Sequence, residues 1–207
     1  MGRASRVYKD IGDRKWIAAI ESSAYGLDTD TKTVSRPAWL QMYDKSFHLY
    51  LDAYQRSDAW YVGINAATLA LLTGESEVAV KIARKILDEL AVKIDHASDD
   101  RFWMFATEGE AALILCGAEN AGEAKNAGEA KNAMDFYQAA LDCLSKESWN
   151  MADSPYSQVC RIWQFLGPSN PNNPATAVLE LFENSPAAPH LKSNGLRHPD
   201  SSKGEKS

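Results

Sequence analysis

Cysteine and histidine are scarce in this sequence, and their spacing excludes several kinds of site. The 207 residues include four histidines and only three cysteines, Cys116, Cys143 and Cys160. Each cysteine stands alone among apolar or aromatic neighbours, which is typical of buried, reduced thiols. No histidine stands at a metal-ligand spacing from a cysteine, and a catalytic thiolate would need a nearby base. The sequence therefore predicts no metal site, no cofactor and no catalytic cysteine.

The chain also lacks an excess of basic residues and any long apolar run. Lys and Arg number 22 against 28 Asp and Glu, which gives a net charge of -6 and a pI near 5.3. Nucleic acids and anionic membranes attract an excess of positive charge, so neither is an expected partner. No run approaches the roughly 18 uncharged apolar residues that span a bilayer, and the N-terminus lacks the apolar core of a signal peptide. We expect a soluble, cytoplasmic protein.

Signals for β-strands are nearly absent, whereas apolar residues recur at helical spacing. Residues 37–54 place an apolar residue every three or four positions, with Pro37 in the first turn. Asp99 and Asp100 are candidate caps of a later helix, and Gly74, Gly117 and Gly167 are predicted to end three helices. We predict an all-α fold with helices over residues 8–23, 37–54, 60–73, 76–94, 102–116, 133–144, 149–166 and 175–183.

Three segments fall outside these helices. Residues 26–36 form a predicted polar loop. Residues 185–207 are rich in Pro, Ser, Lys and Gly and cannot bury enough apolar surface to fold, so we expect one folded domain over 1–184 and a disordered tail over 185–207. The hexapeptide AGEAKN occurs twice, over 121–126 and 127–132. It is interpreted as an exposed helix start or a mobile loop, since no strand precedes it and no phosphate-loop Lys follows.

A pattern of small and larger packing residues recurs in the second helix of successive helix pairs. In each pair a small residue is followed by packing residues four and seven positions later, which lets the paired helices approach closely. The pattern is typical of tetratricopeptide repeats and predicts a helical-hairpin solenoid of about three repeats. The positions are Ser46, Tyr50 and Ala53; Ala79, Ala83 and Ile86; and Ala133, Tyr137 and Ala140.

Two motifs are more specific than the repeat pattern. They are RVYKD over 6–10 and DAWYVGINAATLALLTG over 58–74. Together they resemble the tetratricopeptide-like TRAFs-binding domain of MAP kinase kinase kinases, which also occurs in many bacterial proteins beside signalling or effector modules. In that family a YKD element ends one helix and a GIN element opens the first helix of a later repeat. Here the YKD motif is Tyr8, Lys9 and Asp10, and the GIN motif is Gly63, Ile64 and Asn65.

The resemblance covers residues 6–167 and implies a regulatory helical scaffold that recruits partner proteins and performs no chemistry. No kinase signature accompanies it. The polar loop 26–36 and the duplicated hexapeptide depart from the family. The YKD motif stands almost at the N-terminus, which implies a trimmed version or a fragment of a longer architecture.

Asn65 has two interpretations. It satisfies a buried contact, with a loop backbone or with the YKD motif, or it lines a concave groove and binds a partner's backbone. Glu108 and Glu110 are two positions apart and point in different directions on a helix, so we interpret them as a solvated face and not as an acid/base pair. The candidate groove residues are Trp60, Tyr61, Asn65, Lys81, Arg84 and Trp103.

The main hypothesis is therefore a non-enzymatic scaffold in signalling that binds a protein or peptide partner. Two other classes remain open. One is a structural module that forms homo-oligomers through exposed helix edges. The other is an enzyme with an unrecognised site around Trp60, Asn65 and Trp103, although the sequence contains no convergent nucleophile and base. The sequence leaves the partner and the oligomeric state undetermined.

Overall fold

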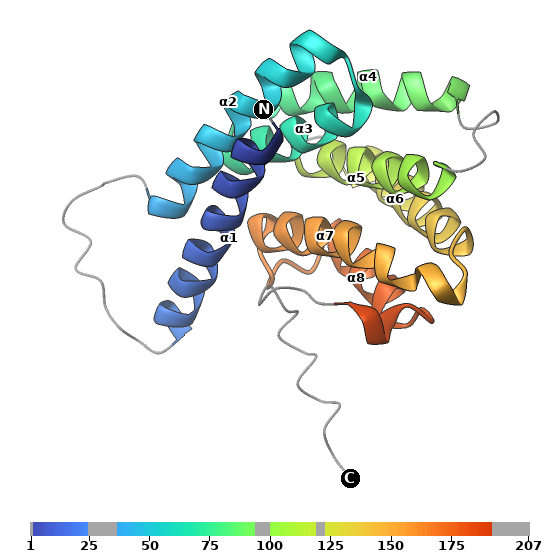
Figure 1. Ribbon diagram of the computed structural model, residues 1–207. Coiled ribbons are helices and arrows are strands. Elements are labelled where there is room, and N and C mark those ends of the chain that lie inside the picture. The colour runs from blue at the N-terminus through green and yellow to red at the C-terminus, as the bar shows by residue number, and fades with distance from the viewer. Residues whose placement is uncertain (1, 25–36, 94–99, 119–122, 192–207) are drawn as a thin grey trace.

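The computed structural model describes residues 2–24, 37–93, 100–118 and 123–191 (Figure 1). All regular structure in these ranges is helical, which confirms the predicted all-α class. None of the described helices is both long and apolar enough to cross a membrane. The helices are α1 (Gly2–Ala24), α2 (Ala38–Ser57), α3 (Trp60–Thr73), α4 (Ser76–Lys93), α5 (Arg101–Ala118), α6 (Glu123–Asp142), α7 (Asp153–Leu166) and α8 (Pro174–Glu183), with the 3-10 segments η2 (Lys146–Ala152) and η3 (Ala188–His190).

Helices that follow one another in the chain pack together, from α1 against α2 through to α5 against α6, and then α7 against α8. In addition α3 contacts α5, α5 contacts α7, and α6 contacts α8. Figure 1 shows the helices following a curved row from the blue α1 to the orange α7 and α8. The helices α3, α5 and α7 therefore contact one another in turn, and each also packs against the helix that follows it.

The sequence explains which helices lie inside. In α3 all but four of the 14 residues are buried, and α5 is buried along nearly its whole central length. A helix that is apolar on all sides must be enclosed by others, because no face of it prefers water. By contrast α4 buries a single stripe, formed by Ala79, Ile82, Ala83, Ile86 and Leu90. Its other face is left to solvent.

Two glycines allow close contact between inner helices and aromatic rings. A Cβ atom on Gly63 would lie 2.7 Å from Cε2 of Tyr54, and a Cβ on Gly109 would lie 2.7 Å from Cδ2 of Tyr137. Any larger residue would have to displace these rings. The glycine of the GIN motif therefore serves close packing of α3.

The predicted helix ends are confirmed at two of three glycines. Gly74 and Gly167 have positive φ angles of 89° and 94° and follow the last residues of α3 and α7. The prediction for Gly117 is wrong, because α5 continues through it to Ala118. A Cβ at Gly117 would lie 2.9 Å from Cδ2 of Leu166. This glycine makes room for another helix and does not end its own.

Other boundaries also differ from the predictions. The helix predicted from residue 8 begins at Gly2, and the one predicted over 149–166 is divided into η2 and α7. Residues 123–132 of the duplicated hexapeptide belong to α6, as in the helix-start interpretation. Ala187 is buried and η3 contacts η2, so the predicted tail boundary at Ser185 is too early. The tail beyond 191, the loop 26–36 and Asp99 lie outside the described residues, whereas Asp100 accepts the first helical bond of α5, from the backbone N–H of Met104.

Candidate functional site

Charged side chains of the first and seventh helices meet inside the protein. Arg161 of α7 donates to Asp13 of α1 through Nε (2.8 Å to Oδ1) and Nη2 (2.6 Å to Oδ2). The Tyr43 hydroxyl donates to Asp13 Oδ1 at 2.6 Å, and Arg161 Nη1 donates to Gln158 Oε1 at 2.6 Å. Asp13 is 6% exposed and Arg161 is 5% exposed. A two-pronged, buried ion pair therefore joins helices 148 residues apart in the chain.

The same network continues onto the central helices. Gln158 Nε2 donates to Glu110 Oε1 at 3.2 Å and approaches Asn65 Oδ1 at 3.4 Å. The Thr68 hydroxyl donates to Glu110 Oε1, and Lys9 Nζ donates to Asn65 Oδ1 at 3.0 Å. Lys9 and Asn65 are half-buried, at the edge of the network. We name this set the inner polar cluster: Lys9, Asp13, Tyr43, Asn65, Thr68, Glu110, Gln158 and Arg161.

Burial and charge shift the pKa values within the inner polar cluster. Burial lowers the pKa of Lys9 to about 8, with a further contribution from the charge of Arg161. Burial raises the pKa of Glu110 to about 7, although the Thr68 hydrogen bond and the Lys9 charge oppose the rise. Burial also acts to raise the pKa of Asp13, but the hydrogen bonds and charge of Arg161 outweigh it and lower that pKa. The Asp13–Arg161 pair thus stays ionised near neutral pH, where Glu110 titrates.

The geometry of the inner polar cluster suits contacts between helices. Its donors and acceptors are directed at one another, and two surface pockets of the protein are lined by other residues. Buried polar groups are costly when left unpaired, so the cluster favours one arrangement of α1, α3, α5 and α7 over others. Among the described residues, no group of three His, Cys, Asp or Glu side chains could hold a metal ion.

Asn65 joins the two motifs that carry the family resemblance. Its Oδ1 accepts from Lys9 of the YKD motif, and its Nδ2 donates to the backbone carbonyl of Tyr61 at 2.9 Å. The predicted contact between the motifs is therefore present. It is formed by two side chains, and the backbone partner lies in the same helix as Asn65, not in a neighbouring loop.

The six predicted groove residues do not line one groove. Trp60 and Tyr61 are adjacent at the start of α3, with ring centroids 6.2 Å apart. Trp103 is half-buried in α5 against Phe102, and Asn65 belongs to the inner polar cluster. Lys81 and Arg84 lie one turn apart on the exposed face of α4. Trp60, Asn65 and Trp103, the residues of the hypothetical enzyme site, line neither of the two pockets. Asn65 is in addition hydrogen-bonded to protein groups.

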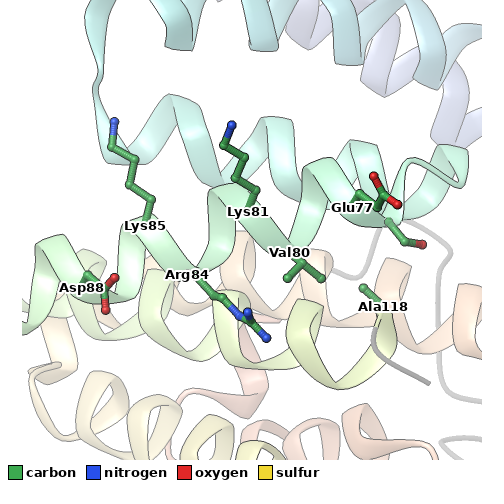
Figure 2. A pocket seen from close by; sticks show the side chains of 8 residues that line it. Glu77, Val80, Lys81, Arg84, Lys85, Asp88 and Ala118 are labelled. Carbon is green, nitrogen blue, oxygen red and sulfur yellow. The ribbon is translucent and has the colours of Figure 1, made fainter. Parts of the chain in front are cut away.

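Lys81 and Arg84 line a surface pocket of about 620 Å³, which we name the α4 groove. Figure 2 shows Lys81 and Lys85 extending to one side of α4 and Arg84 to the other, with Val80 and Ala118 beside it. Lys85 forms an ion pair with Asp58 at the end of α2. The full lining is Ser76, Glu77, Val80, Lys81, Arg84, Lys85, Asp88 and Ala118.

The interpretation of Glu108 and Glu110 as a solvated face is wrong, because they are only 3% and 6% exposed. They do point in different directions, but α5 contacts α3, α4, α6 and α7, so both directions lead into the protein. Glu108 Oε2 is buried with no hydrogen-bond partner, and burial raises the pKa of Glu108 to about 7. The apolar sequence AALILC that follows Glu110 could have indicated that this helix is enclosed by others.

Sequence reasoning also missed Asp13, Gln158 and Arg161. Asp13 stands among other charged residues of α1, and Gln158 and Arg161 share the otherwise amphipathic α7, so the sequence does not set them apart from an ordinary polar face. Arg161 stands in the apolar stretch VCRIW, and an arginine there is buried only if it is paired. That position could have indicated a buried ion pair, but not its partner.

Comparisons of this chain with protein-family models, with curated proteins and with solved structures found no match. The resemblance to the TRAFs-binding domain therefore depends on the two motifs alone.

Proposed function

We propose that this chain is a non-enzymatic scaffold of tetratricopeptide type that binds another protein or peptide in signalling. The inner polar cluster is the observation that carries the proposal. Its polar and charged groups hydrogen-bond to one another, which suits a rigid body of helices better than a reaction site, where such groups must face a substrate.

Two further observations support the proposal. The order of helix contacts resembles that expected for the hairpin pairs α1/α2, α3/α4, α5/α6 and α7/α8 placed side by side, with α3 touching α5 and α5 touching α7. The Lys9–Asn65 hydrogen bond joins the YKD and GIN motifs, and this gives both motifs a shared structural reason to occur in one chain.

The experiment that tests the proposal is affinity capture from cells of the source organism, followed by reconstitution with each retained protein. Arg161→Glu is the matched negative control, since it places a second carboxylate against buried Asp13 and should disrupt the inner helices. The proposal predicts a protein that is retained by the wild type, is lost with the control and binds the purified chain at a fixed stoichiometry. If no protein passes these steps and light scattering shows a stable homo-oligomer, the structural alternative replaces it.

A further inference from the structure

We draw no further inference here: the strongest candidate, the pocket of about 410 Å³ that Leu141, Trp149 and Leu181 line between α6, η2 and α8, carries nothing, because the described part of the structure does not show what covers it.

Discussion

Replacing Glu108 with glutamine should stabilise the protein, and the size of the effect should depend on pH. The Glu108 side chain is buried in α5, and its Oε2 has no hydrogen-bond partner. Burial raises the pKa of Glu108 from 4.5 to about 7. At roughly 1.4 kcal/mol per pH unit, that rise corresponds to about 3 kcal/mol of penalty for the ionised form. We expect about 2 kcal/mol or more of this penalty to be measurable.

The sign follows from the direction of the shift. The folded protein holds the Glu108 proton more tightly than the unfolded chain, so the penalty is absent below about pH 4.5 and complete above about pH 7. Glutamine has the same shape and no charge. The Glu108→Gln variant should therefore match the wild type near pH 5 and exceed its free energy of unfolding by about 2 kcal/mol near pH 8.

Urea denaturation followed by circular dichroism, at both pH values, measures this difference. Glu180→Gln is the matched control, since it makes the same chemical change at an exposed position of α8 and should leave the stability nearly unchanged. Other groups that titrate in this range are common to both proteins and cancel in the comparison. A gain of equal size near pH 5 and pH 8, or a loss near pH 8, would refute the reasoning that Glu108 is an ionised, unpaired group in the folded protein.

Three further sets of variants test the packing of the helices. Arg161→Met leaves Asp13 charged and unpaired and should lower the free energy of unfolding by about 3–5 kcal/mol in urea denaturation; adding Asp13→Leu should recover much of the loss. The pKa of Lys9 is lowered from 10.5 to about 8 in the folded protein, so the penalty for its buried charge disappears between these pH values and the free energy of unfolding should rise there. Lys9→Met should abolish this rise in urea denaturation. Gly63→Ala should lower the free energy of unfolding by about 1–3 kcal/mol, because the added methyl group meets an aromatic ring. Gly128→Ala, at a helical position with open space, should raise it by up to about 1 kcal/mol in the same urea denaturation. Equal effects at the two glycines would contradict the close packing described for α3.

Most helices could be predicted because their own sequence contains the relevant signal. The apolar period of α4 and the glycine after α3 define those helices within a residue or two. The start of α1 could not be placed, because residues 2–7 are mainly small or polar and show no apolar stripe. Gly117 was misread for a different reason. A glycine either ends a helix or admits a neighbour, and the neighbour here, Leu166, comes from a distant part of the chain.

The candidate site was less predictable than the helices. The pairing of Lys9 with Asn65 could be anticipated from the motifs, but the links to Gln158 and Arg161 depend on how α7 returns to α1. The sequence of α7 alone does not show that α7 packs against α1. The same limit explains the error at Glu110, whose surroundings are set by the helices that pack around α5 and not by its position on α5.

Closure of α1 onto α7 restricts where a partner can bind. Arg161 and Asp13 hold α7 against α1, so a peptide cannot enter between these two helices unless this ion pair separates. Outer faces such as that of α4 remain exposed.

Binding and stability should then respond differently to substitution. Disruption of the Asp13–Arg161 pair should reduce partner binding only in proportion to the unfolded fraction. A fully folded Arg161→Met variant that binds a partner more tightly than the wild type would instead show that the inner face is the binding surface and that the ion pair keeps it closed.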